Sequence, residues 1–144
     1  MGTTTMGRTV VPAKIESLED LYGVQKGTVN PQEVRSVETP DALVDNGATL
    51  LSLPTRMIDQ LGLRRLRKRR VRTSAGYVEA HVCEPVRLTV QGRECMIEVA
   101  EVPDMSPVLI GQVPLELLDF LVDPINQRLV GNPEHGGEQM IEMF

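Results

Sequence analysis

The amino-acid sequence predicts a mainly β fold built from many short strands and a few short helices. Three observations predict it: apolar and polar residues alternate in several short runs, turn-forming residues separate these runs, and apolar residues at helical spacing occur only in brief stretches. The 144 residues are 41% hydrophobic and 24% charged, which is typical of a globular domain that buries its own core. We expect one domain over residues 1–144, with its core at about 8–133 and a tail at 134–144.

Composition also narrows the function classes. Aromatic residues make up only 3% of the chain and Trp is absent, so the core should be aliphatic and base stacking on nucleic acid is disfavoured. The net charge of −5 gives no general attraction for nucleic acid. No stretch approaches the roughly 18 apolar residues of a membrane span, and the first residues lack the pattern of a signal peptide. We therefore expect no membrane segment and a cytoplasmic protein, in which the two cysteines stay reduced.

The first third of the chain should contain two strands and a helix. Residues 8–15 indicate a short strand that Pro12 interrupts or edges. Ser17 is placed to cap a helix that stops near Gly23 or Gly27. Residues 34–38 alternate as a half-buried strand, and residues 39–41 should turn the chain into the next strand, which ends at Asp45.

The middle of the chain should form two hairpins. Residues 54–62 fit a short helix with Pro54 near its start and Gly62 at its end. The basic residues 64–72 and the alternating residues 77–82 predict a hairpin with a small tip. Residues 86–90 and 93–99 predict a second hairpin around Gln91 and Gly92.

The last third should contain a short strand, a helix and a closing hairpin. Residues 108–111 are apolar and end in Gly, and residues 114–121 predict a helix with Leu115, Leu118 and Leu121 on its buried side. Residues 121–124 and 127–130 predict the hairpin. Residues 139–144 are interpreted as a last strand, which could lie at a dimer interface.

The sequence gives little support for catalysis by histidine or for a metal site. Four residues offer metal-ligating side chains: His81, Cys83, Cys95 and His135. A two-residue turn at Gln91 and Gly92 places Leu88 opposite Cys95 and Cys83 near Ala100. At ~3.3 Å per residue, the two thiols are then roughly 17 Å apart, too far for a shared metal or a disulfide. We expect no metal site and two thiols in the core.

The basic run at residues 64–72 has three possible roles. It contains seven of the fifteen basic residues, and such a run can grip phosphates. It can equally be a solvated strand face, or it can attract acidic side chains of a peptide. The acidic net charge and the lack of stacking aromatics make nucleic acid an unlikely partner.

Asp45 stands out among the carboxylates, because an apolar run precedes it and another apolar segment follows its turn. The turn itself is also typical of a plain β-turn, since Asp, Asn and Gly are common turn residues. Residues 43–49, however, resemble the apolar-apolar-Asp-Thr/Ser-Gly-Ala signature of retropepsin-like (clan AA) aspartic proteases. The second half of that signature is similar to Leu109, Ile110 and Gly111, which precede a predicted helix. Residues 45–111, from the Asp of the first half to the Gly of the second, span 67 residues. Residues 114–133 resemble a bacterial subgroup, and the similarity covers residues 8–133.

The resemblance implies a retropepsin-like closed β-barrel with one to three short helices, acting as a homodimeric aspartic endopeptidase without cofactor. Catalysis by two carboxylates that share a proton needs two Asp side chains, and this chain supplies one suitable Asp, so two copies of Asp45 would form the dyad. The substrate would be a polypeptide. The resemblance also implies roles for three groups of residues: the active-site loop Asn46, Gly47 and Ala48; the flap Thr73, Ser74, Ala75 and Gly76; and the second signature Leu109, Ile110 and Gly111.

Asn46 departs from the pattern, because the family has Thr or Ser at this position. The hydroxyl of that residue bonds across to the partner's loop in the family, and an amide can also donate and accept. Two alternatives therefore stay open. One is a weakly active or inactive module that binds peptides or dimerises. The other, less favoured, is a nucleic-acid-associated protein that uses residues 64–72.

Overall fold

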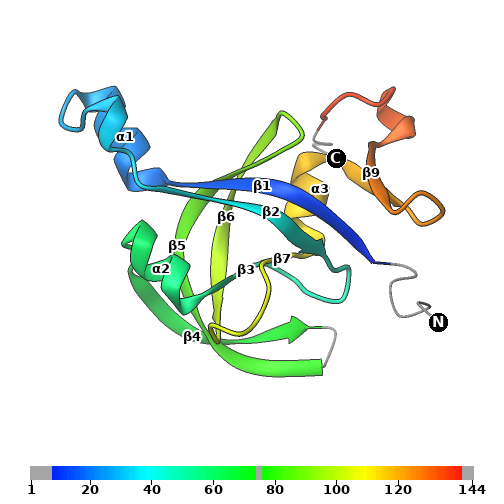
Figure 1. The fold of residues 1–144 in the computed structure, drawn as a ribbon, viewed down its shortest axis with the longest axis horizontal. Coiled ribbons are helices and arrows are strands. Elements are labelled where there is room, and N and C mark those ends of the chain that lie inside the picture. The colour runs from blue at the N-terminus through cyan, green and yellow to red at the C-terminus, as the bar shows by residue number, and fades with distance from the viewer. Residues whose placement is uncertain (1–7, 74–75, 141–144) are drawn as a thin grey trace.

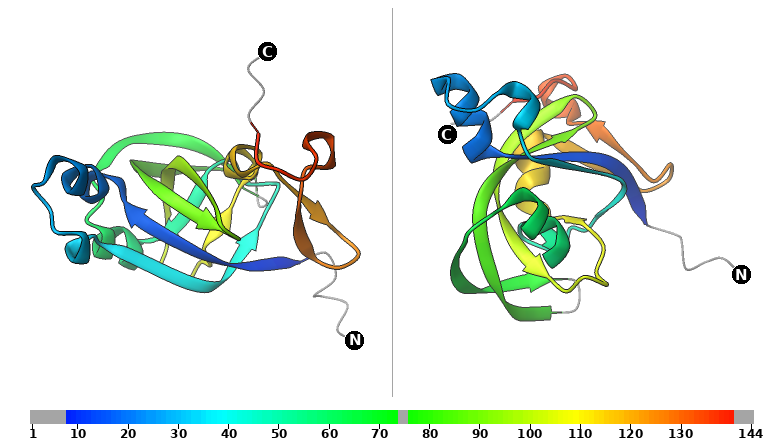
Figure 2. Two further views of the ribbon diagram at one scale, coloured as in Figure 1. Left: turned by 90° about the horizontal axis from the view of Figure 1, so that it is seen from above. Right: turned by 60° about the vertical axis from the view of Figure 1, so that its left-hand side comes forward.

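In the computed structural model, which describes residues 8–73 and 76–140, most strands join in one sheet that closes on itself. The strand order is β1-β2-β7-β3-β6-β5-β4, and β1 also pairs with β5, so six strands form a ring and β4 extends it as an edge. Figures 1 and 2 show helix α1 at one end of the ring and a small separate sheet at the other. The expected mainly β class is confirmed, and the ring is compatible with the retropepsin-like fold.

The elements follow one another in short segments. The ring and its edge contain β1 (Thr9–Ser17), β2 (Ser36–Val44), β3 (Leu51–Pro54), β4 (Arg65–Thr73), β5 (Gly76–Val90), β6 (Arg93–Val102) and β7 (Leu109–Ile110). The small sheet pairs β8 (Phe120–Asp123) with β9 (Arg128–Gly131). The helices are α1 (Leu18–Lys26), α2 (Thr55–Leu61) and α3 (Gln112–Leu118), with 3-10 turns at Pro31–Glu33 and Pro133–His135.

The core inside the ring is aliphatic, as composition predicts. Its largest fully buried side chains are Ile15, Leu51, Leu53, Ile58, Leu61, Leu88, Ile110 and Leu118. They come from both halves of the chain, and together with the other core residues they form one cluster. Burying apolar surface is the main favourable term in folding, so this cluster holds the site's strands in place.

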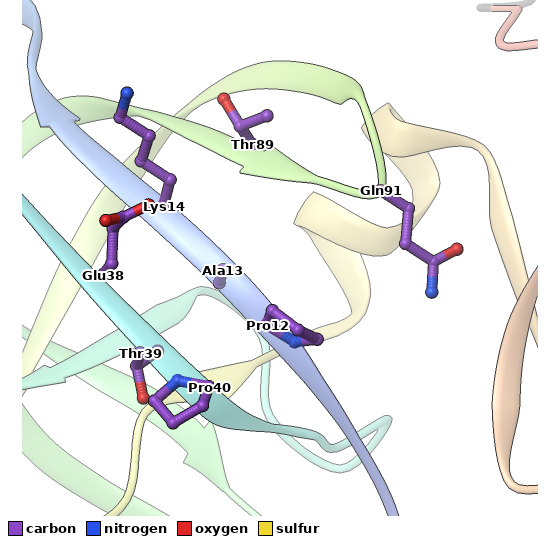
Figure 3. A pocket seen from close by; sticks show the side chains of 8 residues that line it. All are labelled: Pro12, Ala13, Lys14, Glu38, Thr39, Pro40, Thr89 and Gln91. Carbon is purple, nitrogen blue, oxygen red and sulfur yellow. The ribbon is translucent and has the colours of Figure 1, made fainter.

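The turn predicted before the Asp45 strand is absent, and two prolines at a β-bulge explain why. Residues 39–41 do not turn the chain, because β2 runs unbroken through Pro40. Its pairing with β1 shifts there, so that Pro40 and Asp41 face Pro12 alone. At such a bulge neither proline has to donate a ladder hydrogen bond. Figure 3 shows Pro12 and Pro40 side by side at the open pocket of about 430 Å³ that borders the bulge.

The termini of α1 and α2 follow the expected signals, but those of α3 do not, because α3 already begins at Gln112, two residues before the predicted start at Pro114. The Ser17 hydroxyl accepts a hydrogen bond from the Asp20 N–H at 3.2 Å, and α1 ends at Gly27 in the left-handed conformation. Helix α3, however, ends at Leu118, because Asp119 already adopts φ +60°. Leu121 therefore lies in β8 and is 47% exposed, so its predicted place on the buried side of a helix was wrong. No helix among the described residues combines the length and hydropathy needed to span a bilayer.

Candidate active site

Asp45 is the first residue after β2, and its carboxylate is held by its own turn. The apolar end of β2 brings it there, and the side chain is half-buried. Its Oδ1 accepts a hydrogen bond from the Gly47 N–H at 2.8 Å, and its carbonyl accepts one from the Ala48 N–H at 3.1 Å. Such local hydrogen bonds fix an Asp side chain relative to the backbone.

The second half of the signature lies directly against the first. Strand β7 pairs parallel with β2 and antiparallel with β3, so Leu109 and Ile110 fill the gap between the strands on either side of the Asp45 turn. The Asp45 N–H donates to the Ile110 carbonyl at 3.0 Å. Segments far apart in the sequence therefore position the same carboxylate.

Gly111 makes this close approach possible. Its N–H donates to the Leu50 carbonyl at 3.0 Å, and the next N–H, of Gln112, donates to the Ala48 carbonyl at 2.9 Å. A Cβ at Gly111 would lie 2.5 Å from the Leu50 carbonyl oxygen and 2.8 Å from the carbonyl carbon and oxygen of Ala48. Only Gly fits against backbone at such distances.

The two remaining loop residues differ in exposure. Ala48 is 1% exposed, so its side chain belongs to the interior of the isolated chain. Asn46 is exposed, at the edge of an open pocket shared with α3 and β8. Within the described part of the chain, the Asn46 side chain makes no hydrogen bond, so its amide is available to another molecule.

The predicted flap corresponds to the end of hairpin β4–β5. Thr73 and Gly76 are its last paired residues, and Gly76 has φ +107°, a conformation that favours Gly. The tip itself, Ser74 and Ala75, lies outside the described residues. Figure 1 shows the far end of this hairpin below the loop that follows β2, on the same side of the ring.

The basic run is partly neutralised by glutamates that sequence reasoning missed. Three ion pairs link it to β5 and β6: Arg64 with Glu84 at 2.7 Å, Arg65 with Glu101 at 2.7 Å and Arg67 with Glu98 at 2.9 Å. The hydrogen bonds from Arg65 lower the pKa of Glu101 to about 2, and burial opposes this shift. The alternation of apolar and polar residues predicts that these glutamates lie in strands. It does not predict their arginine partners, because these depend on how β4 pairs with β5.

The cysteines and histidines do not form a chemical site. Cys83 and Cys95 are buried and free, and burial raises the pKa of each thiol to about 11. Within residues 8–73 and 76–140, no cluster of three or more His, Cys, Asp or Glu side chains has the arrangement of a metal site. His135 instead contacts the Asp119 carboxylate at 2.6 Å, a contact that the sequence did not predict.

Comparison with known proteins agrees with this arrangement. A family model described as gag-polyprotein putative aspartyl protease matches residues 26–116, well over half of the 144-residue chain. The match includes the Asp45 turn, hairpin β4–β5, strand β7 and Gly111. A search of curated proteins found no match. The chain therefore belongs to this family of retropepsin-like aspartyl proteases.

Proposed function

We propose that the protein is an aspartic endopeptidase that works as a homodimer, with one Asp45 from each copy in the catalytic dyad. One observation carries the proposal: both signature halves hold the half-buried Asp45. The Gly47 N–H of the first half donates to its carboxylate, and the Ile110 carbonyl of the second half accepts from its backbone N–H. The family match spans both halves and supports a protease-like domain. Because the chain has one such Asp, the second carboxylate must come from a second copy.

The reaction needs two carboxylates that share one proton. One Asp45 takes a proton from water while the water oxygen attacks the peptide carbonyl carbon. The other, protonated Asp45 donates its proton to the carbonyl oxygen, which gives a tetrahedral intermediate. A proton then passes to the peptide nitrogen, the C–N bond breaks, and a carboxylic acid and an amine leave. No metal or cofactor takes part in this scheme.

The exposed Asn46 supports a second copy at this turn. Its amide can donate and accept, and within the described residues it has no partner in its own chain. In the proposed dimer each Asn46 bonds across the two-fold axis to the partner's loop, where relatives use a hydroxyl. The tail after residue 133 is proposed to add to the same interface. The two unpaired thiols fit a reducing compartment, and we propose a cytoplasmic location.

Peptide cleavage tests the proposal directly. We expect cleavage of a mixed peptide library at mildly acidic pH, inhibition by a statine-type mimic of the tetrahedral intermediate, and loss of cleavage in Asp45→Asn. Asp41→Asn is the matched control, because it removes an exposed carboxylate four residues earlier on β2 and should leave cleavage intact. Equal cleavage by Asp45→Asn and the unmodified chain would overturn the proposal.

Mixed dimers test whether the dyad is shared. When the unmodified chain is mixed and exchanged with Asp45→Asn at constant total concentration, a shared dyad loses activity as the square of the unmodified fraction. A site complete within one chain loses activity in direct proportion instead. Sedimentation equilibrium on the same mixtures reports the dimer, and a strictly monomeric protein with full activity would contradict the shared dyad.

The alternative is a peptide-binding or dimerisation module with little or no activity, and Asn46 at the Thr/Ser position favours it. Binding of peptides without cleavage, unchanged by Asp45→Asn, would support this module. Nucleic-acid binding through residues 64–72 has less support, because three arginines of the run already pair with glutamates. Oligonucleotide affinity that falls steeply with salt would favour it.

A further inference from the structure

A small pocket lies between the segment that follows the Asp45 turn and hairpin β4–β5. Its volume is about 170 Å³, the size of one side chain and well below the usual size of a small-molecule site. It is lined by Thr49, Leu50, Arg67, Arg69, Arg70, Val71, Val82 and Glu98. Thr49 and Leu50 follow Asp45 by four and five residues, so a peptide held at Asp45 and under the hairpin has this pocket within reach.

The pocket carries more positive than negative charge. Arg67 donates to Glu98 at 2.9 Å, so this pair is neutral overall. Within the part of the chain that the structure describes, no carboxylate forms an ion pair with Arg69 or Arg70. Arg70 instead lies over the ring of Tyr77, with 4.6 Å from its guanidinium carbon to the ring centroid, which holds it in place. Successive side chains of a strand point to opposite faces, so Arg70 lies with Tyr77 on one face of β4, and Arg69 lies with Val71 on the face of the pocket. Among the described residues, one unpaired guanidinium group, that of Arg69, is thus left for a ligand.

The remaining lining is apolar. Val82 is 1% exposed and Val71 is 9% exposed, and both sit with Leu50 beside the arginines. A lining of this kind fits a side chain with an aliphatic stem and a charged end. Carboxylates form strong, geometrically defined hydrogen bonds with guanidinium groups, whereas a lysine would meet like charge. A nucleic acid fits less well, because a cavity of this size admits one side chain.

We infer that this pocket is a specificity pocket that binds a Glu or Asp side chain of the polypeptide substrate, with Arg69 as its recognition group. The inference rests on the proposed function and adds the substrate class. Glu98 then acts as an internal competitor, because its carboxylate occupies Arg67. The two roles predict opposite effects: loss of Arg69 weakens the preference for acidic peptides, and loss of the Glu98 charge strengthens it.

The test measures peptide binding and cleavage separately. Binding is measured by fluorescence anisotropy on full-length Asp45→Asn, with labelled peptide libraries that differ only by Glu, Gln or Lys at one position at a time. We expect the Glu libraries to bind best at one position. Adding Arg69→Gln should reduce that binding about tenfold, because it removes a charged hydrogen-bond donor. Adding Glu98→Gln should increase it severalfold.

Lys68→Gln is the matched control. It removes one positive charge from the same strand, and Lys68 does not line the pocket. Equal binding of Glu, Gln and Lys libraries, no binding of any acidic library, or equal losses in Lys68→Gln and Arg69→Gln would overturn the inference. Arg69→Glu offers a further check, since it should shift the preference toward Lys.

Cleavage by the unmodified chain keeps the two proposals distinct. Cleavage without any preference for acidic residues would overturn the proposed specificity pocket but support the proposed protease function. Acid-selective binding without cleavage would overturn the protease function but support the pocket as part of a binding module.

Discussion

Gly111→Ala should destabilise the protein even though its backbone conformation suits Ala. Gly111 has φ −84° and ψ −173°, which is ordinary extended backbone. In the absence of contacts, Ala would therefore stabilise the fold by about 0.4–1 kcal/mol, because it restricts the unfolded chain. The new Cβ, however, would lie 2.5–2.8 Å from backbone atoms of Leu50 and Ala48, which cannot rotate away.

The cost of this overlap can be estimated. Overpacking a tight interior typically costs about 1–3 kcal/mol, and a contact with backbone on two sides belongs at the upper end. After the gain in the unfolded state is subtracted, we expect a net loss of roughly 2 kcal/mol. With a urea m value of about 1–3 kcal/mol/M, the unfolding midpoint should fall by roughly 1 M. Circular dichroism during urea titration measures it.

Gly111→Ala should also reduce peptide cleavage by molecules that are still folded. The displaced carbonyls of Leu50 and Ala48 belong to the segment that follows Asp45, so the turn at Asp45 should shift with them. Gly27→Asn is the control: Gly27 has φ +80°, nothing lies within 4 Å of an added Cβ, and Asn tolerates this conformation. Its midpoint should stay close to that of the unmodified chain. A midpoint for Gly111→Ala at or above that of the unmodified chain would refute the close-approach argument.

Three further predictions concern residues away from Asp45. Glu101→Gln should weaken the contact with Arg65 and lower the free energy of unfolding by about 1–3 kcal/mol. Because the folded pKa of Glu101 is about 2, below its ordinary 4.5, this stabilisation should be present above pH 4.5 and disappear as the pH falls toward 2. Unfolding of both proteins at several pH values measures the difference. The Cys83 thiol, with a pKa of about 11, should resist thiol reagents at pH 8 until the protein unfolds, and rapid labelling of the folded chain would contradict its burial. Asp119→Ala removes the acceptor of the Met140 N–H, so limited proteolysis should cut the segment after β9 sooner and leave the ring intact; equal cutting would disprove this anchoring role.

Local turn chemistry made parts of the fold predictable from sequence. Gln91 and Gly92 both adopt positive φ, as their two-residue hairpin requires, and Leu88 pairs with Cys95 as expected. The cap at Ser17 was predictable for the same reason, since its partner is three residues away. The family signature around Asp45 was visible as a pattern of residue types. These features depend on neighbours in sequence.

Features that depend on the detailed register of paired strands, or on contacts between residues far apart in the sequence, were not predictable. Cys83 pairs with Val99 and not with Ala100, because β5 shifts register between Cys83 and Val86. Pro40 stays within β2 because it lies at a bulge, opposite Pro12 on the neighbouring strand β1. Helix α3 ends at Leu118, where Asp119 adopts φ +60°, and the Asp119 carboxylate accepts a hydrogen bond from the Met140 N–H, 21 residues later. The sequence shows none of these partners at a fixed spacing.

The position of β7 has a consequence for biosynthesis. Val44 pairs with Ile110, so the carboxylate that follows β2 is not locked in place until a segment made much later has left the ribosome. Contacts between such distant residues form late, because a long loop must close first. A nascent chain therefore carries Asp45 long before β7 can hold its turn rigidly, and under the proposed function we expect incomplete chains to be inactive.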